Sequence, residues 1–495
     1  MRDKGMSTHS FLAFDLGAES GRAILGRLEN KHLHIKETSR FPNEMVSTRG
    51  SLHWNIFSLF EEMKKCLKAC ASNTIDQPES IAVDTWGVDF ALLAHDGSIL
   101  GLPYAYRDSR TKGAMEEFFN LVSREHIYKL TGIQFIQFNS LFQLYAMKRG
   151  NSSLLDITDS LLFMPDVFNY LFTGEKRTEF TYATTSQLYN PRKKEWAEEL
   201  FKALGISRTI MQEIVASGTI IGNLNKEICQ ETGINQMPVI AVASHDTGSA
   251  VAAVPAEGKD WVYISSGTWS LMGVETKNPI ITDQSRDLNF TNEGGVEGTF
   301  RFLKNITGLW LLQECRKAWL LERNHSYEEL IQASILAAPF RAFIDPDWDE
   351  FLNPQNMPLA IKKSCEKTGQ EIPDNSAAIV RCILESLALK YRFVLDQLKQ
   401  IYLHPINRIH IIGGGAFNQL LCQFTANATG LQVIAGPIEA TAIGNILVQA
   451  LSLGYIDSLT EMRKIIQNSF KLARYKPDKT AEWDSAYERF MNIII

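Results

Sequence analysis

Short apolar runs alternate along the chain with longer amphipathic stretches. The apolar runs FLAFDLG (11–17), SIAVDTW (80–86), PVIAVAS (238–244) and RIHIIGGG (408–415) have the length and bulk of buried strands. Residues 377–399, by contrast, repeat apolar side chains at helical spacing over several turns. Strands that alternate with helices in this way are typical of the α/β class, in which helices cover a mostly parallel sheet.

A strand–turn–strand pattern occurs twice, about half a chain apart. The first turn has the sequence Gly17-Ala18-Glu19-Ser20 and the second Gly267-Thr268-Trp269-Ser270, and an apolar strand precedes each. One repeat at so long an interval predicts two similar lobes and not a solenoid. We place the lobe boundary in the stretch VPAEGKD, which divides the chain into residues 10–253 and 254–480.

Length and charge narrow the classes of protein to consider. A chain of 495 residues exceeds what one hydrophobic core supports. Its net charge of −6 offers no basic surplus for nucleic acid. No apolar run approaches the roughly 18 residues that a membrane helix needs, so we expect no membrane partner. The seven cysteines form no CxxC pair, which predicts reduced, mostly buried thiols in a cytoplasmic protein.

Each glycine turn could hold phosphate oxygens. Glycine lets the backbone turn sharply, and successive N–H groups in such a turn form a cradle for anions. Asp15 lies at the end of its strand just before the first turn, where a carboxylate can hold Mg²⁺ directly or through water. The alternative is an ordinary hairpin with a capping aspartate.

Asp246 is the candidate for proton transfer. It follows the predicted strand 238–244 at the start of the small-residue helix TGSAVAA, and α/β proteins bind ligands at the carboxyl ends of strands. There it could accept the proton of an attacking hydroxyl group. His245 beside it could donate to a sugar hydroxyl. The alternatives are a helix N-cap for Asp246 and a packed core histidine for His245.

Two further clusters suit a polar small molecule. YAYRDSRT places Arg107, Asp108 and Arg110 together, and DTWGVDF (84–90) combines Trp86 with carboxylates. A planar apolar surface beside fixed polar groups would suit a carbohydrate. The alternative is a surface ion cluster with a core tryptophan.

The glycine run 413–415 has two interpretations. It follows a strand as a dinucleotide motif requires, but asparagine stands at position 418 where the third glycine belongs. No acidic residue ends a clear strand about 20 residues later. A nucleotide that lies flat against the backbone fits the run equally well.

Taken together, six motifs and the first glycine turn, DLGAESGR, resemble the FGGY carbohydrate kinases. The turns lie in DLGAESGR and SSGTWSLMG, and SHDTGSA lies between them. The other motifs are IAVDTWGVDFALL, GLPYAYRDSRT, LKNITGLWLLQE and, near the end, IIGGGAFN. All of them stand in the order that the family has. The resemblance covers about residues 10 to 475. It implies an α/β fold of two actin- and hexokinase-like (ribonuclease H-like) lobes, with an active-site cleft between the lobes. The lobe 10–253 would bind mainly sugar and contain the first phosphate loop, and the lobe 254–480 would bind mainly nucleotide.

The resemblance also implies a reaction and a set of site residues. The motifs are most similar to family members that transfer phosphate from ATP to O1 of L-rhamnulose, with Mg²⁺ as the metal. ATP would contact Ala18, Glu19, Ser20, Gly21, Arg22, Thr268, Gln313 and Gly414. The sugar would contact Gly87, His245, Asp246, Thr247 and Asn305, with Asp246 as proton acceptor and Asp15 at the metal. The broader family usually has threonine where Ala18 stands, and Glu19 adds negative charge to an anion loop.

Other functions stay open at this stage. The chain could phosphorylate another ketose or polyol, such as fuculose, xylulose or glycerol. An ATP-driven switch of the actin or Hsp70 type shares the two-lobed fold. A dinucleotide-dependent oxidoreductase would depend on the GGGAFN segment. The sequence leaves the oligomeric state open, and a monomer is one alternative.

Overall fold

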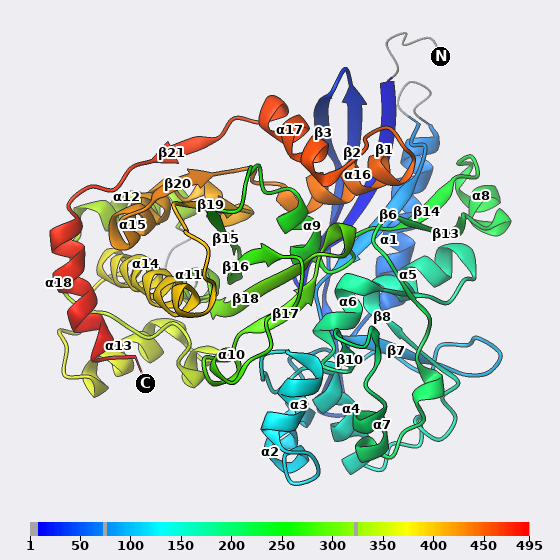
Figure 1. Ribbon diagram of the computed structural model, residues 1–495, viewed down its shortest axis with the longest axis horizontal. Coiled ribbons are helices and arrows are strands. Elements are labelled where there is room, and N and C mark those ends of the chain that lie inside the picture. Colours follow the sequence, from blue (N-terminus) through cyan, green and yellow to red (C-terminus); the bar gives the residue numbers. More distant parts are fainter. Residues whose placement is uncertain (1–7, 73–76, 321–324, 495) are drawn as a thin grey trace. The chain divides into compact units, whose positions relative to one another are not determined.

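The computed structural model describes residues 8–72, 77–320 and 325–494, and its contacts divide the chain into two compact units (Figure 1). The first unit contains the chain up to Pro255 together with Glu275–Phe302 and Ala440–Ser469. The second contains Ala256–Val274, Leu303–Glu439 and the chain from Phe470. Two segments of the predicted lobe 254–480 thus pack with the first unit, and the assignment of sugar and nucleotide to separate lobes stays a prediction.

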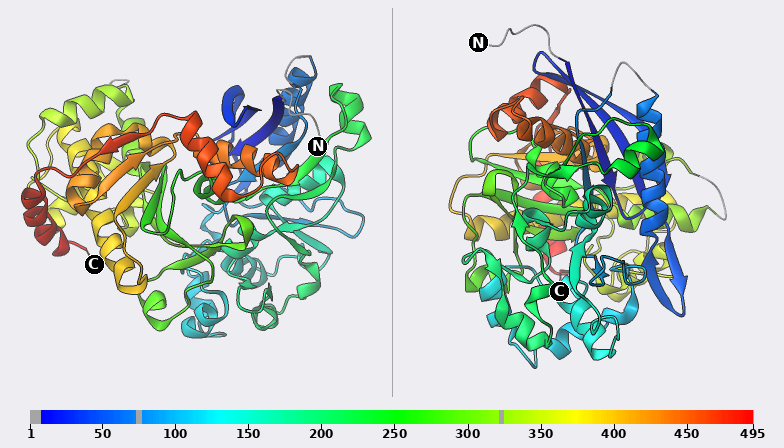
Figure 2. Two further views of the ribbon diagram at one scale, coloured as in Figure 1. Left: turned by 45° about the horizontal axis from the view of Figure 1, so that its top comes forward. Right: turned by 90° about the vertical axis from the view of Figure 1, so that its right-hand side faces the viewer.

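The first unit is built on one mixed sheet. Its strands lie in the order β13-β14-β6-β1-β2-β3, and the blue strands β1 to β3 are long and adjacent in Figure 2. β1 is antiparallel to β2 and parallel to β6, which is parallel to β14. β6 is buried at all five positions, as expected of a central strand covered on both faces. The bounds are β1 Thr8–Leu16, β2 Ser20–Glu29, β3 His32–Pro42, β6 Ile81–Thr85, β13 Thr219–Asn223 and β14 Pro238–Ala241.

Helix α16 (Ala440–Ser452) completes this unit from far along the sequence. It packs against β1, β6 and helix α9 (Asp246–Ala252). A Cβ atom at Gly444 would lie 1.9 Å from the carbonyl oxygen of Ser249, so only glycine allows the two helix backbones to approach this closely. The C-terminal part of the sequence therefore covers the sheet edge that contains Asp246.

The remaining elements of the first unit surround this sheet. Its longest helix, α1, begins at a side-chain cap from Asn55. The bounds are β4 Met45–Thr48, β5 Ser51–Trp54, α1 Ile56–Ala71, β7 Phe90–Leu93, α2 Ala114–Phe118, α3 Arg124–Thr131, α4 Ser140–Arg149, β8 Ser160–Phe163, α5 Met164–Thr173, β9 Thr178–Glu179, α6 Phe180–Thr185, β10 Tyr189–Asn190, β11 Glu195–Trp196, α7 Glu198–Leu204, β12 Ile214–Val215, α8 Lys226–Thr232, α10 Asp283–Asp287, β17 Thr291–Gly294 and α17 Leu459–Ser469.

The second unit repeats the strand pattern of the first. Its sheet contains the order β18-β16-β15-β19-β20-β21. β15 is antiparallel to β16 and parallel to β19, which is parallel to β20. The two glycine turns thus join equivalent hairpins, which confirms the predicted repeat. The bounds are β15 Trp261–Ser266, β16 Trp269–Thr276, β18 Phe300–Thr307, β19 Arg408–Ile412, β20 Gln432–Ala435 and β21 Ala473–Tyr475.

Among the described residues, six α-helices lie in the second unit. The longest is α14, which the amphipathic stretch 377–399 predicted, and it packs against α12 and α15. Asn375 and Asn418 cap α14 and α15 through their side-chain oxygens. The bounds are α11 Trp310–Trp319, α12 Tyr327–Leu336, α13 Met357–Lys367, α14 Ser376–Ile401, α15 Gln419–Thr429 and α18 Thr480–Met491.

Two expectations from composition can be compared with the structure. All seven cysteines are free thiols, and six of them are buried. None of the helices in the described ranges combines the length and the apolar character that crossing a membrane requires.

Candidate active site

Three carboxylates gather where parallel strands of the first sheet end. Asp15 of β1 lies opposite Asp84 of β6 in the strand register. Thr85, the next residue of β6, forms a bridge with His245, which immediately precedes Asp246. Because neighbouring parallel strands end at the same edge, Asp15, Asp84 and Asp246 share one edge of the sheet.

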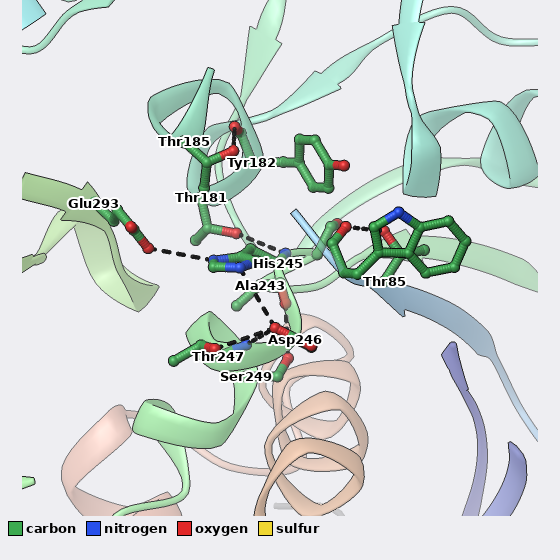
Figure 3. A network of polar contacts seen from close by, with 12 residues as sticks. Thr85, Thr181, Tyr182, Thr185, Ala243, His245, Asp246, Thr247, Ser249 and Glu293 are labelled. Atoms are coloured by element: carbon green, nitrogen blue, oxygen red, sulfur yellow. Dashed lines mark hydrogen bonds and ion pairs between the residues drawn. The ribbon is translucent and has the colours of Figure 1, made fainter. Parts of the chain in front are cut away.

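Asp246 is the first residue of α9, and its carboxylate is held in place. Its Oδ1 accepts hydrogen bonds from the Thr247 backbone N–H at 2.5 Å and the Thr247 hydroxyl at 3.1 Å (Figure 3). His245, not Asp246, occupies the N-cap position, so the predicted capping alternative does not apply. Although 34% of the side chain is exposed, burial raises the pKa of Asp246, and the Asp15 carboxylate adds to this against the opposing effect of His245.

His245 is fixed by an ion pair that sequence reasoning missed. Its Nδ1 lies 3.2 Å from Nη2 of Arg301 and 3.3 Å from Oε2 of Glu293, and Figure 3 shows the contact with Glu293. Arg301 is completely buried, lies 3.1 Å from Glu293 and donates to the Gly294 carbonyl oxygen at 2.8 Å. Burial favours the neutral acid, yet Arg301 and His245 hold the pKa of Glu293 below its usual range.

Gly87 lies directly beside His245, and this position requires a residue without a side chain. A Cβ atom there would lie 3.1 Å from His245 Nε2, closer than most real contacts. Any larger residue would push against the imidazole ring. The structure therefore brings together Gly87, His245, Asp246 and Thr247, the four first-unit residues predicted to contact sugar.

Glu179 anchors the connection from β14 to α9. One carboxylate oxygen accepts from the Thr181 hydroxyl and from the Ser244 N–H at 3.1 Å, and the other accepts from Ser217 at 2.6 Å. Thr181 in turn accepts from the His245 N–H at 3.2 Å (Figure 3). Sequence reasoning missed Glu179. Its position before a helix suggests an N-cap, but only the fold reveals its contacts with Ser217 and Ser244.

The first glycine turn is a tight hairpin beside Asp15. The Gly17 N–H donates to the Ser20 carbonyl oxygen at 2.9 Å, and Asn43 donates to the Gly17 carbonyl oxygen at 2.8 Å. Asp15 is buried and pairs directly with Arg22. Arg22 therefore places positive charge beside Asp15, and the contact of residues 18–22 with phosphate stays a prediction.

The predicted sugar cluster around Trp86 is a buried scaffold. Asp89 is completely buried and accepts hydrogen bonds from the indoles of Trp54 and Trp86, the backbone of Tyr106 and the side chain of Gln143. Burial raises the pKa of Asp89 to about 6. Since Trp86 is 5% exposed, it is a core tryptophan, as the alternative interpretation stated, and not an open planar surface for a sugar.

Asp108 and Arg110 do not form the surface ion cluster of the alternative interpretation. Asp108 is buried and accepts from the backbone N–H groups of Leu52 and Arg110. Arg110 donates to the backbone and side-chain oxygens of Gln143 and lies over the Tyr104 ring. Both therefore support the fold around the scaffold.

The oxygen donors at the sheet edge fit a hydrated magnesium ion. Asp15 is engaged by Arg22, and in the described ranges no three His, Cys, Asp or Glu side chains could hold a metal ion. One oxygen of Asp84 is buried and has no hydrogen-bond partner among the described residues. An oxygen-only set with few direct ligands suits Mg²⁺, which keeps several waters.

The second unit presents backbone at the equivalent edge. The carbonyl oxygen of Thr268 accepts from the N–H groups of Gly308 and Trp310. A Cβ atom at Gly415 would lie 2.0 Å from the hydroxyl oxygen of Ser266, whereas one at Gly414 would have no described atom within 4 Å. The turn at Thr268 and the run 413–415 thus meet at Ser266, with the Gly414 backbone open.

The other predicted contacts of the second unit lie on neighbouring elements. Gln313 is in α11, and among the described residues its side-chain oxygen is buried without a hydrogen-bond partner. Asn305 is on β18. Asn418 caps α15 and bonds Tyr327, so it completes a helix start and not a dinucleotide loop.

A carboxylate at a helix start, beside a fixed histidine and a glycine hairpin, defines a phosphotransferase-like site on a duplicated α/β fold. The sequence model described as the FGGY family of carbohydrate kinases, N-terminal domain, matches residues 10–253, and the C-terminal domain matches residues 262–453. The chain belongs to this family and is a carbohydrate kinase, as the six motifs predicted.

Individual relatives agree with this assignment. A Bacteroides thetaiotaomicron protein named rhamnulokinase is 49% identical over 485 residues, which cover 98% of this chain and 99% of that protein. An Oceanobacillus iheyensis protein of the same name is 43% identical and covers 94% of this chain and 97% of its own. Gluconate kinase from Lactobacillus acidophilus has the same fold, with a TM-score of 0.81 over 98% of each chain at 15% identity.

Proposed function

We propose that this kinase transfers the γ-phosphoryl group of ATP to O1 of L-rhamnulose, which gives L-rhamnulose 1-phosphate and ADP in L-rhamnose catabolism. The observation that carries the proposal is the 49% identity, over nearly the full length of both chains, to the Bacteroides thetaiotaomicron protein. The arrangement around Asp246 supports it, because it provides a proton acceptor beside residues that suit a polyhydroxy substrate. A cytoplasmic location stays a prediction.

Asp246 would act as the general base. Its carboxylate accepts the O1 proton while O1 bonds to the γ-phosphorus and the bond to the bridging oxygen of ADP breaks. Positioning matters more than basicity in this reaction. The two hydrogen bonds from Thr247 and the restraint of His245 by Arg301 would provide that positioning.

The other predicted residues would divide between sugar and nucleotide. Gly87, His245 and Asn305 would contact the sugar, and His245 Nε2 would face its hydroxyl groups. Residues 18–22 and Thr268 would line the phosphates, while Gln313 and Gly414 would contact the nucleotide. Mg²⁺ would neutralise phosphate charge, and Asp15 would hold it through the oxygen ligands that this ion prefers.

A panel of sugars tests this proposal. ADP release would be measured with ATP and Mg²⁺ in the presence of L-rhamnulose, L-fuculose, D-xylulose, glycerol or no acceptor. The highest kcat/KM should belong to L-rhamnulose, and the release without acceptor should be slow. A higher kcat/KM for another acceptor would overturn the substrate assignment, and steady release that no acceptor changes would indicate an ATPase switch.

A further inference from the structure

Asp84 occupies the middle of the acidic sheet edge, yet the proposed reaction gives it no role. β6 lies between β1 and β14, so Asp84 is flanked by the strand of Asp15 on one side and the connection to Asp246 on the other. Its side chain is completely buried. A buried carboxylate at this place requires either hydrogen bonds to both oxygens or a nearby cation.

One oxygen of Asp84 is held by a buried polar chain from helix α16. Asn445 donates to Oδ2 at 2.6 Å and accepts from Gln449 at 2.8 Å. Gln449 also accepts from the Ser80 hydroxyl at 2.7 Å and donates to the Leu12 carbonyl oxygen at 3.2 Å. The side chains of Asn445, Gln449 and Ser80 are completely buried. The direction of the Asp84 carboxylate is therefore fixed by residues that contact both β1 and β6.

The other oxygen, Oδ1, has no hydrogen-bond partner among the described residues. Two other buried carboxylates of the same unit are satisfied at both oxygens, whereas Asp166, like Asp84, has an orphan oxygen. Asp89 accepts hydrogen bonds at both of its oxygens, from Gln143 and from Trp54 and Trp86. Glu179 likewise accepts at both. An orphan buried acceptor next to a catalytic residue points to a ligand that the protein itself does not supply.

The charge of this edge favours a cation. Asp15, Asp84 and Asp246 are three carboxylates, and Arg22 pairs with Asp15. A divalent cation near the edge would relieve the repulsion between these carboxylates.

We propose that Asp84 is part of the magnesium site, where its free oxygen Oδ1 interacts with the hydrated ion and Asn445 holds the carboxylate in the required direction. The inference depends on the magnesium site of the proposed function and adds Asp84 and Asn445 to it. Asp84 is a positioning residue for the metal, in contrast to the catalytic Asp246. Outer partners of this kind typically change metal affinity about 10- to 100-fold when they are removed.

The test measures metal binding without sugar. Mn²⁺ replaces Mg²⁺ because it accepts the same carboxylate and water ligands, and free Mn²⁺ is followed by electron paramagnetic resonance as it is titrated into enzyme saturated with ADP. Asp84→Asn should weaken Mn²⁺ binding about tenfold or more. Asn445→Ala should weaken it less, because Asp84 stays present but loses its anchor. The affinity for ADP in EDTA should not change in either variant.

Asp166→Asn is the matched control. Asp166 is a buried aspartate of the same unit, one of its oxygens also has no hydrogen-bond partner in the described structure, and it lies on α5, where its Oδ1 accepts from the Glu179 N–H at 3.3 Å. It should bind Mn²⁺ with the wild-type affinity. Unfolding midpoints in EDTA show whether each variant is folded.

The remaining outcomes distinguish a failure of the metal inference from a failure of the substrate assignment. Unchanged Mn²⁺ affinity in Asp84→Asn would overturn the inference, as would an equal loss in Asp166→Asn or a loss of ADP affinity in EDTA. If the sugar panel rejects L-rhamnulose but Mn²⁺ binding still depends on Asp84, only the substrate assignment fails. A wild-type enzyme that binds no Mn²⁺ with ADP would contradict both proposals.

Discussion

The two sheets have the same strand pattern but different chemistry where the hairpin strand meets its parallel neighbour. In the first sheet Asp15 lies opposite Asp84. At the corresponding place in the second sheet Ser265 lies opposite Ile412. The hairpin turns differ by one residue: the Gly17 N–H donates to the Ser20 carbonyl oxygen at 2.9 Å, and the Gly267 N–H donates to the Trp269 carbonyl oxygen at 2.8 Å.

The comparison shows how one fold can serve two tasks. Ionisable side chains gather at the edge of the first sheet, where Asp246 could move a proton. The second sheet offers backbone groups and small residues, which would bind phosphate or a nucleotide without transferring protons. Function thus depends on the residues placed at the strand ends, and not on the shared fold.

The largest effect is expected at Asp246. Asp246→Asn should lower the rate of sugar-dependent ADP release about 10²- to 10⁴-fold, because the amide cannot accept the hydroxyl proton. Calorimetry should show unchanged ADP affinity. The exposed Asp287→Asn, in the same unit, is the control. The wild-type rate should rise with pH through the raised pKa of Asp246, since only the ionised carboxylate is a base. An Asn variant with the parental rate would exclude Asp246 as the base.

A second prediction concerns the ion pair behind His245. Arg301→Met should lower the free energy of unfolding by about 3–5 kcal/mol, because it leaves Glu293 buried without its cation. Adding Glu293→Gln should recover part of this loss, and urea unfolding measures both. If the single variant is as stable as the wild type, Arg301 does not hold this part of the first unit together.

A third prediction separates two neighbouring glycines of the second unit. Gly415→Ala should destabilise the protein by about 1–3 kcal/mol, since its methyl group would overlap Ser266. Gly414→Ala has room for the methyl group and should leave stability unchanged while it weakens ADP binding. Thermal unfolding and calorimetry would measure both properties. Equal effects of the two variants would contradict the proposed backbone contact at Gly414.

The smallest expected effect is a pH-dependent gain in stability in the variant Asp166→Asn. Burial, and then the Glu179 carboxylate, raise the pKa of Asp166 well above its ordinary value. The folded protein therefore binds this proton more tightly than the unfolded chain, and wild-type stability falls as pH rises above the ordinary value of about 4. Asp166→Asn should be more stable at neutral pH, and its advantage should vanish near pH 4. Urea unfolding at several pH values tests this, and a constant difference would contradict it.

Local sequence could predict most elements but few of the contacts between them. The turns at Gly17 and Gly267 and the place of Asp246 follow from apolar runs and glycines within a few residues. Local sequence groups Asp84 with Trp86 in a sugar cluster, whereas the structure pairs Asp84 with Asn445, 361 positions later.

Other contacts of the site also join residues that are far apart in the sequence. Arg301 contacts His245 from 56 positions away, and Ser244 contacts Glu179 from 65. Neither separation leaves a periodic or spacing signal, because packing between distant segments decides which side chains meet. The N-cap alternative for Asp246 depended on one residue of register, which local propensity does not resolve.

The late position of α16 in the sequence has a consequence for biosynthesis. This helix supplies Asn445 and packs its Gly444 directly on the helix of Asp246. A ribosome adds residues 440–469 after all six strands of the first sheet, so the first unit must wait for them with one face of its sheet uncovered. Early release of the chain, before these residues are made, would leave apolar surface exposed on an otherwise nearly finished domain.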